Sequence, residues 1–457
     1  MKPLVVINVA GLTPALMGEA TPKLNGLASG FRAHVGSVLP AVTCPVQATY
    51  LTGLSPRDHG IVANGWYHRD LAEVLFWRQS ARLVSGETAW AAGRSRDRGF
   101  TCAQLFWWFN MYCGADWAVT PRPAYPADGR KIPDIYAEPP EVRTALNTKL
   151  GRFPLFNFWG PTANIESTRW IASAAAEILR TKRPTLTLVY LPHLDYDLQR
   201  LGPGHPDIPA RVREVDAEAG RVADAARAHG AEVIVLSEYG VAPVGGAVHL
   251  NRELRERGFL RVQRVLDRWE LLDPGASRAF AVADHQVAHV YVRDPADVAG
   301  VKAALEKTPG VARVLDEAGK REAGLDHPRS GELVALAAPD RWFTYYYWLD
   351  DRLAPDFART VDIHRKPGYD PVELFLDPAL SVPKLRVAWK LLKKSMGFRT
   401  LMDLIPLDAS LVKGSHGLPP AREEEGAVLL STSQTGAADR IKPEAVKNLI
   451  LATMFEG

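Results

Sequence analysis

Short apolar runs alternate with amphipathic stretches along much of the chain. Residues 4–9 form a run rich in β-branched side chains, and similar runs recur at 185–191 and 232–236. Between the last two, residues 208–229 space Ala, Arg and Glu as a long helix does. Apolar runs without polar alternation are typical of strands buried on both faces. The pattern therefore predicts a mostly parallel sheet covered by helices on both sides.

Changes in this rhythm divide the chain of 457 residues into five segments. A core α/β domain is predicted from residues 1–111, 162–278 and 341–457, the last including a C-terminal tail. Residues 112–161 are rich in Pro, Gly and aromatic side chains and are expected to form an ordered cap. The pattern of short strands and a helix over residues 279–340 predicts a small α/β insert. The length is thus explained by one large sheet domain with a cap and an insert.

Composition adds limits on the class of protein. Hydrophobic residues make up 47% and charged residues 23%, which excludes a disordered or fibrous chain. The net charge of +3 gives no argument for binding a nucleic acid polymer. The three cysteines, Cys44, Cys102 and Cys113, favour a reducing compartment. With neither a signal peptide nor an apolar run of membrane-spanning length in view, we expect a cytoplasmic location.

Polar side chains suited to phosphate or metal chemistry follow the predicted strands. Thr43 lies just before a predicted helix, where free backbone N–H groups favour an anion, although its position alone fits an N-cap slightly better. His193 and Asp195 follow the strand at 185–191, and such a cluster suits a divalent metal about as well as a solvated turn. Further candidates near strand ends or in the C-terminal third are Glu238, Tyr239, Asp284, His285, His289, His364 and His416.

These motifs together resemble the alkaline phosphatase superfamily, in particular its nucleotide pyrophosphatase/phosphodiesterase branch. The resemblance rests on Gly11-Leu12, Thr43, the stretch TGLSPRDHGI at 52–61 and Asn64, in the family's order and spacing. It covers most of the first 240 residues and the His416-Gly417 pair. It implies a three-layer α/β/α sandwich of alkaline-phosphatase type. It also implies that Thr43 attacks phosphorus, that Asn64 holds a phosphoryl oxygen, and that two metal ions assist.

The expected metal ligands are where the sequence departs from this family. Ala10 stands where the family has Asp, Gln199 where it has His, and Tyr239 where it has a second His. The ligand positions that keep a suitable side chain are Thr43, Asp195, Glu238 and His416.

Two explanations of the altered ligands stay open. In the first, which the number of unmatched His and Asp residues favours, a rebuilt site holds a divalent metal, Zn²⁺ before Mn²⁺ or Mg²⁺. The replacement ligands would come from His193, Asp197, His285, His289 and His364. In the second, metal binding is lost and the protein is a non-catalytic binder of phosphorylated ligands. Cys44 as a thiolate nucleophile is a third and less favoured interpretation.

The sequence therefore predicts a metal-dependent phosphoryl-transfer hydrolase with a Thr nucleophile. Its substrate is expected to be a small molecule with a phosphodiester, pyrophosphate or phosphonate bond, contacted by Asn64, Tyr239 and Trp108. Nothing in the sequence decides the oligomeric state. The basic amphipathic stretch at 384–396 indicates a surface helix packed by its apolar face, with contact to an anionic membrane as the less favoured interpretation.

Overall fold

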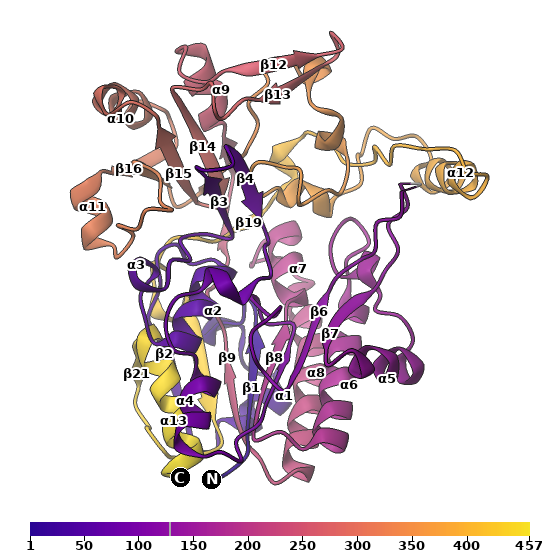
Figure 1. Ribbon diagram of the computed structural model, residues 1–457, viewed down its shortest axis with the longest axis vertical. Coiled ribbons are helices and arrows are strands. Elements are labelled where there is room, and N and C mark those ends of the chain that lie inside the picture. Colours follow the sequence, from indigo (N-terminus) through magenta and orange to yellow (C-terminus); the bar gives the residue numbers. More distant parts are fainter. Residues whose placement is uncertain (128) are drawn as a thin grey trace.

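The first apolar run forms β1 (Leu4–Val9), which is buried along its whole length and lies at the centre of a nine-stranded sheet. The computed structural model describes residues 1–127 and 129–457. The sheet has the order β21-β2-β20-β9-β1-β8-β5-β6-β7 (Figure 1). Its other strands are β2 (Phe31–Val35), β5 (Cys102–Leu105), β6 (Trp117–Pro121), β7 (Ile135–Glu138), β8 (Leu186–Leu191), β9 (Glu232–Leu236), β20 (Ala427–Ser431) and β21 (Arg440–Ile441).

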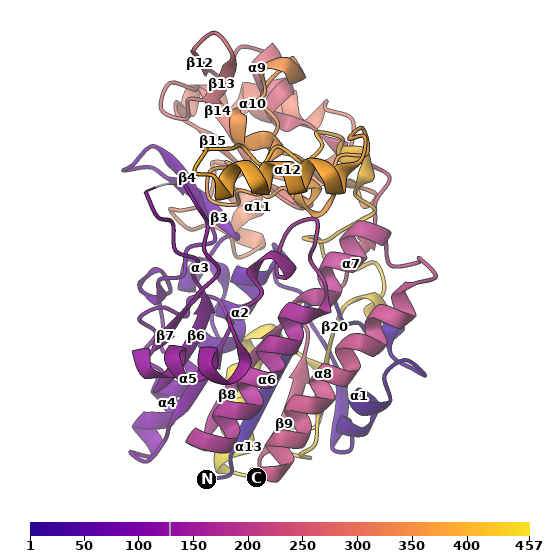
Figure 2. The same ribbon diagram turned by 90° about the vertical axis from the view of Figure 1, so that its right-hand side faces the viewer.

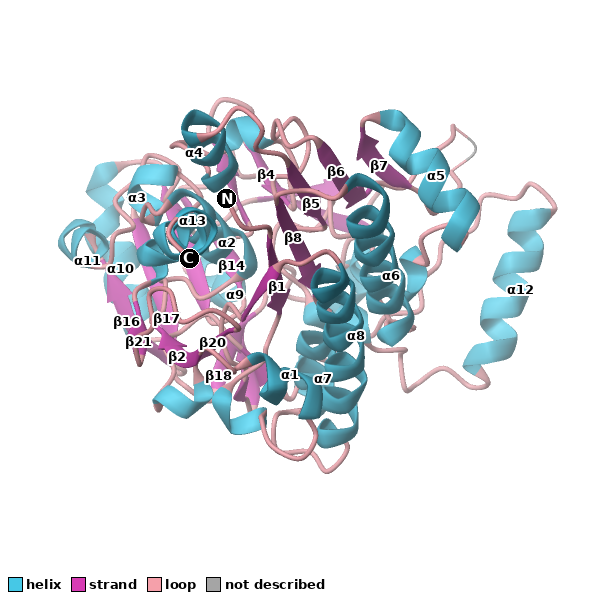
Figure 3. Cartoon of the chain, turned by 90° about the horizontal axis from the view of Figure 1, so that it is seen from below, coloured by secondary structure: helices cyan, strands magenta, loops and turns pink. Residues whose placement is uncertain are grey.

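Parallel pairing dominates the middle of this sheet. β1 runs parallel to β8 and β9, and β5 runs parallel to β8 and β6, whereas β20 and β7 pair antiparallel to their neighbours. Figure 3 shows one group of helices on each face. One face carries α6 (Ile165–Lys182), α7 (His193–Leu201) and α8 (Ile208–Ala228), and the other α2 (Thr43–Thr52), α4 (Ala89–Arg96) and α13 (Val446–Phe455). The predicted three-layer α/β/α sandwich is confirmed.

A second, smaller sheet lies at the end of the molecule opposite the two termini (Figures 1 and 2). It is antiparallel and consists of β14 (Ala279–Asp284), β15 (Val287–Val292), β17 (Leu333–Ala337) and β16 (Val311–Leu315), in that order. The helices α10 (Val298–Glu306) and α11 (Glu317–Glu322) accompany it. The aromatic run at 342–348 is buried against this sheet. That run is therefore part of the core.

The segment 112–161 differs from the expected cap. It supplies β6 and β7 to the edge of the main sheet, followed by α5 (Pro140–Leu150). Burial explains this placement, because Val119 of β6 and Ile135 and Ala137 of β7 belong to the core that the other strands share. The proposed domain boundaries themselves remain a prediction.

One helix stands clear of both sheets. α12 (Pro383–Ser395) projects sideways from the body (Figures 1 and 3). The expectation that its apolar face is packed was wrong, since Leu385 is 67% and Trp389 53% exposed. No helix in the described residues has both the length and the apolar character that crossing a membrane requires.

Candidate active site

Thr43 is the first residue of α2 and is almost fully buried. The strand expected just before it ends earlier, at Val35, and an irregular segment leads to Val42, whose extended backbone ends where the helix begins. Pro45 fits the first turn because its missing N–H would have no partner within the helix. The Thr43 hydroxyl lies 3.1 Å from the hydroxyl of Tyr239. The fold thus places a buried hydroxyl at the positive end of a ten-residue helix.

Asn64 is fixed beside the start of this helix by three hydrogen bonds. Its Oδ1 accepts from the backbone N–H of Cys44 at 2.9 Å. Its own backbone N–H and its Nδ2 donate to the two carboxylate oxygens of Asp284, at 2.8 and 3.1 Å. Asp284 is the last residue of β14, so the small sheet orients the amide that faces the Thr43 helix. Burial raises the pKa of Asp284 to about 6.

Glu238 is the carboxyl group that lies next to Thr43. Its Oε1 accepts hydrogen bonds from Asn8 Nδ2 at 2.6 Å and Gln47 Nε2 at 2.5 Å. Its Oε2 has no partner in the described part of the chain. Burial raises the pKa of Glu238 to about 8, while the hydrogen bonds from Gln47 and Asn8 and the nearby Thr43 hydroxyl act in the opposite direction. A carboxyl group with one unpaired oxygen therefore lies next to the buried hydroxyl.

A second carboxyl group, Asp195, lies on α7. Its Oδ2 accepts from Gln199 Nε2 at 2.7 Å, and Gln199 Oε1 accepts from the Tyr369 hydroxyl at 2.9 Å. Its Oδ1 lies 3.6 Å from His416 Nε2. Burial raises the pKa of Asp195 to about 7.

Four rings stack in one continuous row beside these carboxyl groups. Ring centroids are 3.7 Å apart for Tyr239 and His416, 3.8 Å for His416 and His285, and 3.7 Å for His285 and Tyr369. Burial lowers the pKa of both histidines well below the ordinary value. Both imidazoles are therefore neutral. Among the described contacts of these groups, no Lys or Arg side chain balances the charge that Asp195, Glu238 and Asp284 carry when they are ionised.

The structure brings together only part of the predicted site. Thr43, Asn64, Glu238 and Tyr239 meet at the start of α2, and Asp195, His285 and His416 adjoin them. Trp108 joins through its backbone N–H, which donates to Gln47 Oε1 at 2.8 Å.

Four other predicted ligands have their described contacts elsewhere. His193 Nε2 contacts Asp197 at 3.0 Å, and Asp197 also pairs with Arg200 and Arg211. Such a carboxylate is already neutralised by cations. The two ring nitrogens of His289 bond to the backbone of Val62 and Gly331. His364 lies at an exposed position, where Arg78 and Lys131 are among its charged neighbours.

Cys44 also fails as a thiolate. It is 1% exposed, and burial together with the nearby Asp284 and Glu238 raises the pKa of its thiol well above the ordinary value. The thiol therefore stays protonated at neutral pH, as expected for a small buried residue.

The residues present do not fit a two-metal centre. Where cations would be expected, amide and phenol groups make hydrogen bonds instead: Asn8 and Gln47 donate to Glu238, and Gln199 donates to Asp195. Tyr239 bonds to Thr43 through its hydroxyl. Among the described residues no group of three or more His, Cys, Asp or Glu side chains is arranged to hold a metal ion. His193 contacts Asp197, and the charged neighbours of His364 are Arg78, Lys131 and Asp362, so no described contact joins either histidine to Thr43; the rebuilt site that includes them stays a prediction.

Sequence reasoning missed three contributors to this site, namely Asn8, Gln47 and Tyr369. For two of them, the position in the sequence could have indicated a role in the site. Asn8 is the one polar residue of the apolar run at 4–9, and Gln47 follows Thr43 by one helical turn. Tyr369 carried none, because its position over His285 depends on a chain segment distant from every other site residue.

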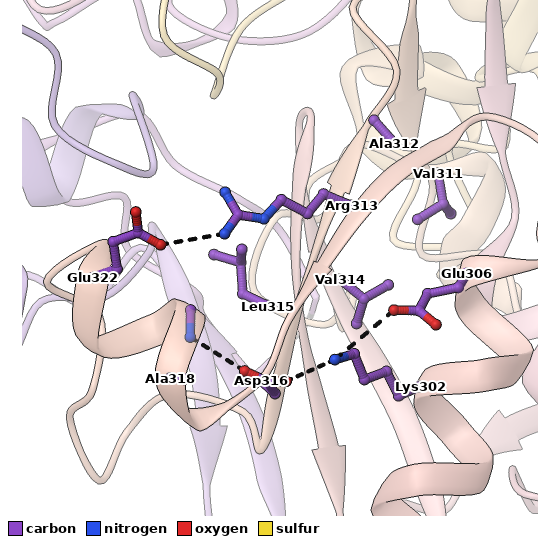
Figure 4. Close-up of a pocket in the computed structure, with 11 residues that line it drawn as sticks. Lys302, Glu306, Val311, Ala312, Arg313, Val314, Leu315, Asp316, Ala318 and Glu322 are labelled. Atoms are coloured by element: carbon purple, nitrogen blue, oxygen red, sulfur yellow. Dashed lines mark hydrogen bonds and ion pairs between the residues drawn. The ribbon is translucent and has the colours of Figure 1, made fainter.

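A surface pocket of about 610 Å³ lies apart from this site (Figure 4). It is on the small insert, between α10, β16 and α11. Ion pairs cross it, such as Lys302 with Asp316 at 2.6 Å and Arg313 with Glu322 at 3.3 Å. None of its lining residues contributes to the Thr43 site.

Comparison with known proteins identifies the family of this chain. Residues 4–370 match the family model described as type I phosphodiesterase/nucleotide pyrophosphatase. The chain belongs to this family. The resemblance read from the Thr43 and Asn64 motifs is thereby confirmed, and hydrolysis of phosphodiester or pyrophosphate bonds is the chemistry of the family.

One curated member of the phosphodiesterase family shows a distant similarity over about half of this chain. An uncharacterized pyrophosphatase/phosphodiesterase of Schizosaccharomyces pombe is 24% identical over 248 residues, which are 52% of this chain and 45% of that protein. The chain thus matches less than half the length of this curated relative.

Solved structures show the same fold over nearly the whole chain. Phosphonoacetate hydrolase from Sinorhizobium meliloti has a TM-score of 0.63 at 17% identity, covering 99% of this chain and 96% of its own. Murine ectonucleotide pyrophosphatase/phosphodiesterase 5 has a TM-score of 0.60 at 15% identity, covering 99% and 95%. At these identities the likeness shows the fold and leaves the activity to the site itself.

Proposed function

We propose that this protein hydrolyses a small phosphodiester, pyrophosphate or phosphonate with Thr43 as the nucleophile. The observation that carries the proposal is the pairing of the buried Thr43 hydroxyl with Glu238, whose Oε2 is free to accept a proton. A hydroxyl is a weak nucleophile until a neighbouring base removes its proton. The position of both groups at the N-terminus of α2 favours negative charge on an attacked phosphoryl group.

The residues divide the reaction into two steps. Thr43 Oγ1 forms a bond to phosphorus while Glu238 takes the hydroxyl proton, and the bond from phosphorus to the leaving group breaks. Asp195 is placed to give the leaving group its proton, since burial raises its pKa to about 7. Water then attacks the phosphorylated Thr43, losing its proton to Asp195, and Thr43 regains a proton from Glu238.

Asn64 and α2 hold the substrate during both steps. Asn64 Nδ2 donates one hydrogen to Asp284 and keeps a second for a phosphoryl oxygen. In the first turn of α2 the N–H of Cys44 donates to Asn64, Pro45 has no N–H, and the N–H of Val46 donates to Val42. The backbone N–H of Thr43 has no partner among the described contacts and is the group left to bind a second oxygen.

The first experiment compares Thr43→Ala with Thr43→Ser. The substrates are an activated aryl phosphodiester, a nucleotide pyrophosphate and phosphonoacetate, the last because a phosphonoacetate hydrolase shares the fold. Thr43→Ala is expected to lower kcat by at least about 10³-fold, and Thr43→Ser is expected to retain a measurable part of the rate because it keeps the hydroxyl. Wild-type turnover by Thr43→Ala would contradict the nucleophile assignment.

Metal dependence is tested in the same assay. Because the donor set does not fit a two-metal centre, activity is expected to survive a chelator. Loss of activity with a chelator, followed by recovery with Zn²⁺ but not with Mg²⁺, would instead support the zinc-dependent hydrolase that the family resemblance suggests.

The second candidate is a binder without catalytic activity. It is favoured by the substituted ligand positions Ala10, Gln199 and Tyr239. No turnover of any of these substrates, with or without added metal, together with calorimetric binding of a phosphorylated compound that Asn64→Ala weakens, would establish it over the hydrolase.

A further inference from the structure

The protruding helix α12 carries an apolar stripe that the rest of the protein does not cover. Leu385, Trp389, Leu392 and Met396 follow one another at spacings of four, three and four residues, which places them on one face of a helix. Their exposed fractions lie between 49% and 67%. None of the hydrophobic clusters formed by the described residues includes an apolar side chain of α12.

Basic side chains outside this stripe contact the loop that follows α12. Lys390 Nζ donates to the carbonyl of Leu401 at 2.7 Å and pairs with Asp403. Arg386 lies 3.7 Å from the same carboxylate. The residues after the helix therefore support this side of α12, while the side chains of the stripe stay exposed. Figures 1 and 3 show α12 clear of the other helices and strands.

Positive charge predominates around the stripe, although Asp403 pairs with Lys390 and Arg386 on its other side. Six basic residues and no acidic residue occur between positions 378 and 402. Lys393 lies with its Nζ 5.2 Å from the ring centre of Trp389, so a cation stands at the border of the apolar surface. Phe398, just after the helix, is 62% exposed and enlarges the apolar area.

We propose that α12 is a docking helix for the surface of an anionic membrane. An interfacial helix has an apolar stripe bordered by cations, with Trp at the boundary, and it lies in the plane of the headgroups. Anionic lipids attract each Lys or Arg near the surface. A second copy of this chain is a poorer occupant, because a two-fold contact through this face would bring the two sets of cations together.

Vesicle flotation of the full-length protein tests this proposal. The vesicles are phosphatidylcholine with and without phosphatidylglycerol, each at low and high salt. Binding is expected only to the anionic vesicles and is expected to weaken at high salt. The double change Lys393→Glu and Lys394→Glu should weaken binding at least about tenfold, because two attractive charges become repulsive.

Apolar contact is tested with a matched pair of variants. Trp389→Glu is expected to lower vesicle affinity at least about tenfold, since it removes a large interfacial side chain and adds a negative charge. Leu71→Glu, which changes a side chain that is 60% exposed outside α12, should bind as the wild type does. Equal loss in both variants would overturn the proposal, and so would absence of wild-type binding.

Two further readouts separate this proposal from its alternatives. Analytical ultracentrifugation that finds a wild-type dimer and a Trp389→Glu monomer, without vesicle binding, would assign the stripe to self-association and overturn membrane docking. Thr43→Ala should bind vesicles like the wild type, so failure of the hydrolase proposal and failure of the docking proposal give different results.

Discussion

The two halves of the Thr43 site differ in how closely they keep the family's pattern. The nucleophile half has Thr43 at the start of α2 and Asn64 beside it, held through Cys44 N–H and Asp284. In the other half Ala10, Gln199 and Tyr239 stand at ligand positions, and amide or phenol hydrogen bonds surround the remaining acids. The comparison shows that the family's motif is kept around Thr43 and Asn64, whereas neutral amide and phenol donors contact the groups around the remaining acids.

Electrostatics accounts for the stability of this arrangement. Three buried carboxyl groups without a compensating cation favour their protonated forms, because low-dielectric surroundings disfavour charge. The pKa values of Asp284, Asp195 and Glu238, about 6, 7 and 8, rise in each case chiefly through burial. Burial without a compensating cation among the described contacts therefore favours proton uptake by these three acids.

Restoring the ligands gives the largest expected effect. The triple change Ala10→Asp, Gln199→His and Tyr239→His adds one carboxylate and two imidazoles to Asp195, Glu238 and His416. We expect the affinity for Zn²⁺ to rise at least about 10³-fold, measured by calorimetry and elemental analysis.

A control with the same changes at exposed positions is Ala72→Asp, Gln434→His and Tyr112→His. It should bind Zn²⁺ no better than the wild type. If the wild type already binds Zn²⁺ as tightly as the triple variant does, the substitutions at positions 10, 199 and 239 have not weakened metal binding, and the contrast drawn between the two halves of the site is wrong.

Glu238→Gln tests the proton acceptor and is expected to lower kcat/KM about 10²-fold. In the wild type, kcat/KM should follow a bell-shaped pH profile with apparent pKa values near those of Asp195 and Glu238, about 7 and about 8. In Glu238→Gln, the side of the pH profile that depends on the ionisation of Glu238 should disappear. An unchanged profile would show that Glu238 does not take the proton.

The same variant changes how stability depends on pH. The folded-state pKa of Glu238 lies above its ordinary value of 4.5, so the folded protein binds this proton more tightly than the unfolded chain does. The contribution of this proton to the free energy of unfolding is complete at pH values below the ordinary pKa, and it is lost as the pH rises to about 8. The Tm of Glu238→Gln should therefore fall less steeply than that of the wild type across this range, as calorimetric scans would show.

Asp284→Asn addresses the positioning of Asn64 and has the smallest expected effect. It replaces one of the two acceptors that fix Asn64, so kcat/KM should fall about tenfold while the Tm changes little. Asp340→Asn, at an exposed side chain, is the control and should behave as the wild type. A loss confined to KM would indicate a role in substrate binding alone.

Much of this site could be predicted from the sequence because its signals are local. The TGLSPRDHGI stretch and Asn64 follow Thr43 closely, and the strand-end positions of Asp195 and Glu238 are visible in the apolar rhythm. His193 was predicted from its strand-end position, but it contacts Asp197, which pairs with Arg200 one turn along α7 and with Arg211 of α8. The pairing with α8 depends on how the two helices pack. The segment at 112–161 misled because its short strands are separated by Pro and Gly.

The sequence by itself determined the three-layer sandwich, the family and the place of Thr43 and Asn64, since hydrophobic periodicity and residue spacing encode them directly. The tertiary structure alone decided which histidines meet, how amides replace cations around Glu238 and Asp195, and that the stripe of α12 is uncovered. The physical reason is that burial and hydrogen bonding join residues far apart in the chain: 230 positions separate Asn8 from Glu238.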